Sequence, residues 1–323
     1  MVQSDNRWQE CRVLVTGGAS FIGSNLVDKL VQLGAEVTVV DDLSSGKLEN
    51  LIDSTNKYKF VELDLEFSTK KELDDIFRDK EFVFHLAAVH GGRGYISTHP
   101  ADVCSNLAID HHVFEACTDS NVEKLIFAST ACVYPTRLQE QIGSDYKLKE
   151  SDSNPKNLDG DMSADIEYGW GKLMSEIQLN SFQKQYGLKS NAMRFVTAYG
   201  PRENETHAII AWIYKALERM DPYQIWGDGK QERDFTFVED LAKGCILAAT
   251  KKNGENETFN ITFGKAETLY KFVTILSKEI KNLKFKIEKR DSFRPRRGTL
   301  SIAKAKKLLN YKPDYDLQKG IKK

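Results

Sequence analysis

The sequence lacks the features that mark a membrane, secreted or nucleic-acid-binding protein. Its 323 residues contain no apolar run near the ~18 residues of a membrane helix. The first ten residues are too polar for a signal peptide. Lys and Arg number 46 against 47 Asp and Glu, so no net field attracts nucleic acid or an anionic membrane. We therefore expect a local site to hold any anionic ligand.

Cysteine is scarce, and its spacing excludes two further classes of protein. No Cys-x-x-Cys pair occurs among the five cysteines, which are Cys11, Cys104, Cys117, Cys132 and Cys245. An odd, scattered set argues against a disulfide framework or a zinc knuckle and favours a reducing, cytoplasmic location. His111 and His112 point in different directions on a helix, so we expect no metal site there.

The first half of the chain alternates apolar, β-rich runs with amphipathic helical stretches. Residues 12–16 read as a buried strand, and apolar positions from Phe21 to Leu33 then recur at helical spacing until Gly34. Further strands are expected at residues 36–42, 59–65, 82–88, 124–130 and 191–199, with helices that include 103–118 and 168–186. Strands that are apolar throughout and separated by helices predict a doubly wound parallel sheet, a Rossmann fold.

After Gly200-Pro201 the regular alternation of strands and helices ends. Longer helices and short strands are expected there, with strands at residues such as 257–263 and 284–289. This change predicts a first, dinucleotide-binding domain over residues 1–192 and a smaller α/β substrate domain over 193–323. Part of 234–263 could return to the first domain. Residues 144–165 are rich in charge and read as a long polar loop.

A glycine-rich turn joins the first strand to the first helix. Gly17 and Gly23 occupy the outer positions of a G-x-x-G-x-x-G spacing, and Ser20 stands where the middle glycine would be. Backbone N–H groups of such a turn, with the helix N-terminus, can hold a pyrophosphate. The turn predicts that a dinucleotide contacts Gly17, Ser20, Phe21, Ile22 and Gly23.

Acidic residues end the second and third strands. Asp41-Asp42 lies roughly twenty residues past the glycine turn, where a carboxylate can accept hydrogen bonds from the adenine ribose. Because such a carboxylate repels a 2′-phosphate, the pair favours NAD over NADP. Asp64 is a second candidate on the adenine side. A strand-end cap is the plain alternative for Asp41, and a solvated strand end for Asp64.

Tyr168 and Lys172 lie four residues apart, on one face of a helix. A free Tyr titrates near ~10, so a phenol that acts as a base at neutral pH needs a nearby cation. Thr130 ends the strand before it, and its hydroxyl can hydrogen-bond the alcohol that Tyr168 deprotonates. Alone, the Tyr/Lys spacing is common on surface helices. Its position after this strand makes it a candidate catalytic pair.

Together these motifs resemble the extended short-chain dehydrogenase/reductase family, specifically its nucleotide-sugar epimerases and reductases. The resemblance covers nearly the whole chain and includes the glycine turn, His85-Leu-Ala-Ala88, Asn106, Ser129-Thr130, Tyr168/Lys172, Tyr199-Gly-Pro201 and Trp226-Gly-Asp-Gly…Arg233-Asp-Phe. It implies NAD as cofactor and a homodimer formed through residues 103–118 and 168–186. Further cofactor contacts are expected from Ser45, Leu65, Leu86, Ala87, Ala88 and Asn106, beside Tyr168 and Lys172.

Substrate contacts are also implied by the resemblance. The residues matching Arg233 and Arg297 grip the nucleotide diphosphate in relatives, and a guanidinium suits phosphate because it donates two parallel hydrogen bonds. A surface ion pair is the alternative for each. Thr197 stands where many relatives have an Asn that contacts the sugar, which leaves the sugar contacts open.

A narrower similarity concerns residues 129–135, which resemble the matching segment of GDP-mannose 3,5-epimerases and GDP-fucose synthases. There the residue matching Cys132 handles protons, and His207 falls where the synthases have a His. His90-Gly91-Gly92 resembles the Gly-Gly loop of the same enzymes. A packed thiol and a solvent-facing imidazole are the alternatives for Cys132 and His207.

The sequence thus predicts an NAD-dependent nucleotide-sugar epimerase, an isomerase that works through a transient C4-keto sugar. Ala131-Cys132 stands where dehydratases and decarboxylases carry an acidic residue, which argues against those reactions. Rotation of the keto sugar would give a 4-epimerase, whereas proton exchange by Cys132 and His207 would give a 3,5-epimerase. A keto-sugar reductase and a non-catalytic dinucleotide sensor are the competing interpretations.

Overall fold

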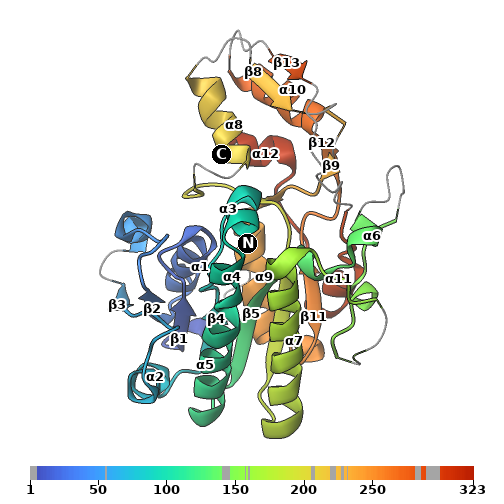
Figure 1. Cartoon of the computed structure of the whole chain (residues 1–323). Helices are drawn as coiled ribbons and strands as arrows, with labels where there is room; N and C mark the ends of the chain where they lie inside the picture. The colour runs from blue at the N-terminus through green and yellow to red at the C-terminus, as the bar shows by residue number, and fades with distance from the viewer. Residues whose placement is uncertain are drawn as a thin grey trace.

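A seven-stranded parallel sheet forms the centre of the molecule (Figure 1). The computed structural model describes residues 6–54, 57–139, 146–156, 158, 161–204, 208–218, 223–226, 229–230, 232–280, 285–288 and 299–323. The strand order is β11-β6-β5-β4-β1-β2-β3, and every neighbouring pair is parallel. The predicted doubly wound fold is confirmed.

The strands and helices of the first half alternate along the chain. They are β1 (Arg12–Thr16), α1 (Phe21–Gln32), β2 (Glu36–Asp41), β3 (Tyr58–Glu62), α2 (Lys70–Phe77), β4 (Phe82–His85), α3 (Arg93–Thr98), α4 (Pro100–Cys104), α5 (Asn106–Asp119), β5 (Lys124–Thr130), α6 (Thr136–Gln139), α7 (Ile166–Tyr186) and β6 (Ser190–Phe195). Short 3₁₀ turns η1 (Asn6–Trp8), η2 (Leu48–Ser54), η3 (Ala131–Val133) and η4 (Glu150–Asp152) lie between them.

Apolar strands fill two hydrophobic layers, one on each side of the sheet. Along β1, Val13 and Val15 pack into a cluster with α1 and with a later helix, α9 (Val238–Thr250). Leu14 packs into a second cluster with α5 and α7. Figure 1 shows α5 and α7 side by side in front of the sheet, and α1 packs against α9 in the other layer. Because successive strand residues face opposite sides, both faces of a continuous apolar strand need a covering helix.

Several element boundaries differ from the sequence prediction. The predicted helix 103–118 is two helices, because α4 ends at Cys104 and α5 begins at Asn106. The predicted strand 82–88 ends at His85, and residues 86–88 leave the sheet as a loop. The predicted strand 191–199 divides into β6 and the separate β7 (Ala198–Tyr199). A residue with positive φ, Thr197, separates the two.

Beyond β7, most elements lie above the sheet in Figure 1, whereas α9, β11 and α11 return to it and share its core. The elements are α8 (Ala208–Leu217), β8 (Tyr223–Trp226), β9 (Glu232–Arg233), β10 (Thr236–Phe237), α9 (Val238–Thr250), η5 (Lys252–Gly254), β11 (Thr258–Ile261), β12 (Glu267–Thr268), α10 (Leu269–Glu279), β13 (Phe285–Glu288), α11 (Ala303–Leu309) and α12 (Leu317–Lys322). Strand β11 pairs with β6, and α9 covers the sheet beside α1.

The upper elements have a core of their own. It includes Ile209 of α8, Phe272 and Leu276 of α10, and Leu317 of α12. The strand pairs β10–β7, β12–β9 and β13–β8 form three small sheets there. In the part of the chain that the structure describes, no helix is both long and apolar enough to cross a lipid bilayer.

Candidate active site

The candidate site lies where the strand order changes direction. From β1 the chain continues to β2 and β3 on one side, and then returns through β4 and β5 on the other. In doubly wound sheets, the loops at the carboxyl ends of the two strands at this switch point form a ligand crevice. Here those strands are β1 and β4, and the glycine turn and residues 86–88 follow them at this edge of the sheet.

The two outer glycines are required by close backbone contacts. Gly17 has φ +67°, and a Cβ on it would stand 2.6 Å from the amide nitrogen of Ala87. A Cβ on Gly23 would lie 2.8 Å from the carbonyl carbon of Gly17 and closer still to its oxygen. Both glycines thus allow close packing of backbone against backbone, which holds the turn against Ala87 and against the start of α1.

Ser20, at the middle position, fits the turn with an ordinary extended backbone, φ −84° and ψ 179°. Its hydroxyl donates to the carbonyl oxygen of Gly17 and makes no capping bond to the helix. The first amides of α1, from Phe21 to Gly23, are therefore not capped by Ser20, and an anion can be held by such amides.

Asp41 is buried at the end of β2 and stabilises the glycine turn through a hydrogen bond. One carboxylate oxygen accepts from the amide of Ala19 at 2.9 Å, and the other accepts from the amide of Leu43 at 2.9 Å. Burial raises the pKa of Asp41, although these two hydrogen bonds act in the opposite direction. Each oxygen has a second lone pair that could accept from a ribose hydroxyl.

The neighbouring candidates on the adenine side are more exposed. Asp42 accepts from the amide and hydroxyl of Ser44, and Asp64 accepts from the amide of Glu66 at 2.8 Å. Ser45 is exposed, whereas Leu65 is buried. The exposed Asp64 matches the solvated strand end that the sequence left open as its alternative role, and the bond from Leu43 gives Asp41 the cap that was its own alternative.

Asn106 supports the loop that follows β4. Its side-chain oxygen accepts from the amide of Val89 at 2.7 Å, and its amide group donates to the carbonyls of Val89 and Val103 at 2.9 Å each. This buried side chain therefore fixes the backbone next to Leu86, Ala87 and Ala88. With the uncapped amides of α1 and with Asp41 bonded to the glycine turn, the residues present fit a dinucleotide such as NAD.

Tyr168 and Lys172 lie on the first two turns of α7, next to the end of β5. Gly169 makes this packing possible, since a Cβ there would stand 3.0 Å from the carbonyl carbon of Cys132. The same carbonyl accepts from the amide of Asp165 at 2.9 Å. Tyr168 is 8% exposed, and the Lys172 side chain is 2% exposed.

Thr130 ends β5 and accepts a hydrogen bond from the amide of Cys132 at 3.2 Å. This bond uses a lone pair of the hydroxyl, so its hydrogen can still be donated to a substrate oxygen. Cys132 is buried in a small cluster with Ile96, Val103 and Tyr168. The thiol predicted to handle protons therefore packs beside the predicted base.

His90 is exposed, and its ring centroid lies 5.6 Å from that of Tyr168. Helix α3 begins two residues after Gly91, at Arg93. Arg93 forms a bidentate ion pair with Asp165, and Gly92 is the N-cap of the helix. This ion pair, which the sequence did not indicate, ties the Gly-Gly loop to the start of α7.

The remaining substrate candidates lie farther along the chain. Thr197 has φ +37°, and its carbonyl accepts from the amide of Thr236 at 3.1 Å. Arg233 is half-buried in β9 and donates to the carbonyl of Glu232 at 2.7 Å. His207 and Arg297 lie outside the described residues.

The structure adds a buried carboxylate beside Lys172 that the sequence analysis missed. Asp110 lies 3.3 Å from the Lys172 ammonium and 2.9 Å from His85. A signal was present, because Asp110 falls at helical spacing on a largely apolar face that includes Val113 and Cys117. A carboxylate in such a face requires a partner.

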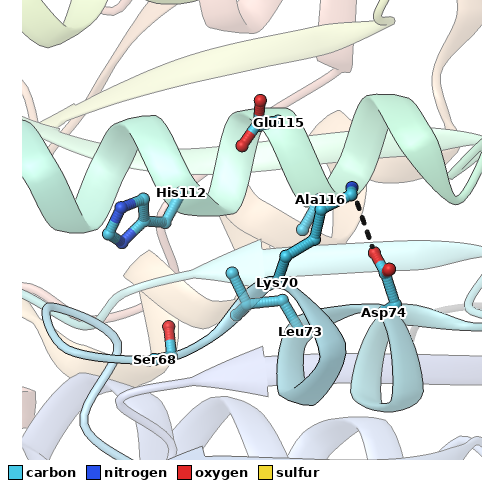
Figure 2. Close-up of a pocket in the computed structure, with 7 residues that line it drawn as sticks. All are labelled: Ser68, Lys70, Leu73, Asp74, His112, Glu115 and Ala116. Carbon is cyan, nitrogen blue, oxygen red and sulfur yellow. Dashed lines mark hydrogen bonds and ion pairs between the residues drawn. The ribbon is translucent and has the colours of Figure 1, made fainter.

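A separate pocket of about 140 Å³ lies between α2 and α5 (Figure 2). Its walls are Ser68, Lys70, Leu73, Asp74, His112, Glu115 and Ala116. Figure 2 shows the ion pair that joins Lys70 to Asp74 across 3.4 Å. The pocket is below the ~300–1,000 Å³ of typical ligand sites and shares no residue with the predicted site. Among the described side chains, no group of three or more His, Cys, Asp or Glu could hold a metal ion.

Comparison with known proteins identifies relatives over almost the whole chain. A putative UDP-glucose 4-epimerase from Methanocaldococcus jannaschii is 32% identical and covers 96% of each chain. GDP-mannose 3,5-epimerase 1 from Oryza sativa subsp. indica is 30% identical over 76% of this chain and 62% of its own.

Solved structures of similar proteins agree. UDP-N-acetylglucosamine 4-epimerase from Methanobrevibacter ruminantium, in complex with UDP-N-acetylmuramic acid, has a TM-score of 0.84 and 31% identity, over 97% of this chain and 98% of its own. Thermus thermophilus UDP-glucose 4-epimerase in complex with NAD has a TM-score of 0.82 and 26% identity, over 96% of each chain.

The model of one family spans most of the chain. The NAD dependent epimerase/dehydratase family matches residues 13–262, which include both the glycine turn and the Tyr168/Lys172 pair. The relatives and solved structures named above confirm the predicted function, that of an NAD-dependent nucleotide-sugar epimerase. This chain belongs to the NAD dependent epimerase/dehydratase family.

Proposed function

We propose that this chain inverts C4 of a hexose that is linked to UDP. The observation that carries this proposal is the packing of Tyr168 against Cys132, just past the carboxyl end of β5, with Lys172 one turn further along α7. The relatives named as UDP-glucose 4-epimerases, which match the chain from end to end, support the choice of nucleotide and carbon.

The chain's own residues would hold the cofactor as follows. The amides of residues 20–23 would hold the pyrophosphate, Asp41 would accept from the adenine ribose, and residues 86–88 would lie along the cofactor. Lys172 and Tyr168 would hold the nicotinamide ribose. Bound NAD would accept the C4 hydrogen as hydride and return it to the other face of the same carbon.

Tyr168 acts first as a base and then as an acid. As the C4 hydrogen leaves, its phenolate takes the proton of the C4 hydroxyl, while Thr130 donates a hydrogen bond to that oxygen. The sugar becomes a 4-ketone, rotates, and presents its opposite face. Tyr168 then returns the proton to the oxygen, so the reaction releases no net electrons or protons.

Inversion at C3 or C5 is a second candidate, and the position of Cys132 favours it. A ketone at C4 makes the hydrogens on C3 and C5 acidic, and the thiol packs against the phenol that creates this ketone. A thiol can exchange protons near neutral pH because its reference pKa is ~8.5. A second acid would be required on the other face, and we propose His207 or the exposed His90 for it.

We assign residues 193–323, apart from the returning α9 and β11, to nucleotide-sugar binding. Arg233 and Arg297 would contact the diphosphate, and Thr197, at the strained backbone between β6 and β7, would contact the sugar. The net charge of the chain is close to zero and does not attract an anionic substrate. The two guanidiniums would therefore supply the local positive charge that the diphosphate needs.

We also infer a homodimer in the cytoplasm. Trp170 and Met174 lie one turn apart on α7 with 52% and 46% of their surface exposed, which is unusual for large apolar side chains on one helix. A two-fold contact through α5 and α7 would cover them. None of the five cysteines forms a disulfide, which suits a reducing compartment.

Incubation of the purified protein with UDP-glucose, followed by NMR analysis of the sugar, tests the proposed function. We expect UDP-galactose to form, and Tyr168→Phe to retain NAD while it loses about 10²–10⁴-fold in turnover. Near-normal turnover by Tyr168→Phe would remove Tyr168 from the mechanism. Inactivity of the wild-type protein toward UDP-hexoses would refute the UDP assignment.

A further inference from the structure

A continuous chain of hydrogen bonds runs behind the catalytic pair. Thr16, at the end of β1, lies 2.7 Å from Nδ1 of His85, and Nε2 of His85 lies 2.9 Å from Asp110. Asp110 then contacts Lys172 at 3.3 and 3.4 Å. All four side chains are buried. This series of hydrogen bonds therefore connects β1, which precedes the glycine turn, to α7, which contains Tyr168.

Chemistry fixes the direction of these hydrogen bonds. Burial would raise the pKa of Asp110, but the Lys172 charge and the bonds from His85 and Ser175 outweigh it and lower the pKa. Burial lowers the pKa of His85 more than Asp110 raises it, so the imidazole is neutral. Because an ionised carboxylate only accepts, Nε2 of His85 carries the hydrogen and Nδ1 accepts from Thr16.

One end of this hydrogen-bond network lies against the glycine turn. The Thr16 hydroxyl accepts from the amide of Ala87 at 3.3 Å, and Ala87 is the residue that lies against Gly17. At the other end, Asp110 receives hydrogen bonds from His85 and from Ser175 at 2.6 Å, besides its contact with Lys172. Each acceptor in the chain has a matching donor.

The carboxylate of Asp110 also offsets the charge of Lys172. The ammonium lies 4.5 Å from the Phe127 ring centroid and is shielded from solvent, so its contact with Asp110 is little screened. One turn further on, Glu176 is paired with Arg194 and Ser129 and adds no net charge. On the substrate side, Tyr168 faces His90 and Cys132.

We propose that Asp110 is a positioning residue that holds the Lys172 ammonium in place, one turn along α7 from Tyr168, and limits how much positive charge reaches the phenol. The inference rests on the proposed role of Tyr168 as the base. A lysine that faced the phenol alone would favour the phenolate strongly. With Asp110 next to Lys172, the phenolate of Tyr168 depends more on the positive charge of the oxidised cofactor. The base therefore forms when oxidised NAD is bound.

The test is a pH titration of Tyr168 in the protein with bound NAD. Carbon-13 label at Cζ of tyrosine reports each phenol by NMR, and Tyr168→Phe identifies one signal among the 12 tyrosines. Asp110→Asn removes a negative charge near the phenolate, so the midpoint should fall. We expect about one pH unit, the scale for charges roughly 10 Å apart at an effective dielectric constant of about 20.

Ser175→Ala is the matched control. It removes one hydrogen bond to the same carboxylate and keeps the charge, so the Tyr168 midpoint should stay at its wild-type value. Asp110→Ser makes the same charge change with a smaller side chain and provides a second measurement if Asp110→Asn folds poorly.

Equal midpoints in wild type and Asp110→Asn would overturn the proposal, as would equal shifts in Asp110→Asn and Ser175→Ala. Failure of both Asp110 variants to fold with NAD would reduce the residue to a structural role and also overturn it. The titration needs no sugar substrate, so an error in the proposed epimerase reaction would not affect its result.

Discussion

Gly169 and Gly171 lie two residues apart on α7, yet the structure predicts opposite effects for the same substitution. A Cβ at residue 169 would stand 3.0 Å from the Cys132 carbonyl carbon and 3.2 Å from its Cβ, with the carbonyl oxygen closer still. A Cβ at residue 171 would meet only the carbonyl oxygen of Val103 at 3.8 Å, an ordinary contact.

The magnitudes follow from these contacts. Replacing a helical Gly by Ala stabilises a protein by about 0.5–1 kcal/mol where space allows, so Gly171→Ala should raise the free energy of unfolding by that amount. Overpacking against backbone costs about 1–3 kcal/mol. Gly169→Ala should therefore lower the free energy of unfolding by about 1–2 kcal/mol after the gain in helix propensity is included.

Activity should separate the variants more clearly. Relief of the contact at residue 169 moves the first turn of α7 away from η3, and with it Tyr168 away from Thr130. A misplacement of about 1 Å can cost about 10²-fold in rate. Urea unfolding and turnover with UDP-glucose measure both effects. Equal stability and activity in the two variants would refute the packing that places Tyr168.

Two further predictions concern buried carboxylates. Asp41→Ala should relax the preference for NAD over NADP, because it removes repulsion of the 2′-phosphate, and should also destabilise the glycine turn, since Ala19 and Leu43 lose their acceptor; equal binding of NAD and NADP by the wild type would contradict this role. Asp234 is buried, and burial raises its pKa from 3.8 to about 7. Because its folded pKa is raised, its contribution to stability is present below pH 3.8 and is lost as the pH rises through about 7. Asp234→Asn should therefore become more stable relative to wild type as the pH rises through this window, and a constant difference in urea unfolding would refute the raised pKa.

The sequence predicted the parts of the fold that depend on local pattern. The sequence predicts strands at residues 12–16 and 124–130 because each has a run of apolar residues at its centre, and β1 and β5 have those bounds. The break at Ser105 was not predictable in this way, because apolar positions continue through Val103 and Ile109 at helical spacing. Tertiary contacts decide where α4 ends, including the bonds that Asn106 makes to Val89 and Val103.

The same limit applies to the site. The glycine turn and the Tyr168/Lys172 spacing are local, so the sequence reveals them. The ion pair between Asp110 and Lys172 joins residues 62 positions apart, and the pair between Arg93 and Asp165 joins residues 72 apart. Such pairings follow from the packing of α5, α3 and α7, which no periodicity specifies.

Turnover of UDP-glucose deuterated at C4, in ordinary and in heavy water, tests the central claim most directly. A C4 epimerase returns the same hydride to the same carbon and moves only hydroxyl protons through Tyr168. We therefore expect the product to keep its C4 label and to gain no carbon-bound deuterium from the solvent. Solvent deuterium at C3 or C5, lost in Cys132→Ser, would contradict C4 inversion and favour proton exchange by the thiol.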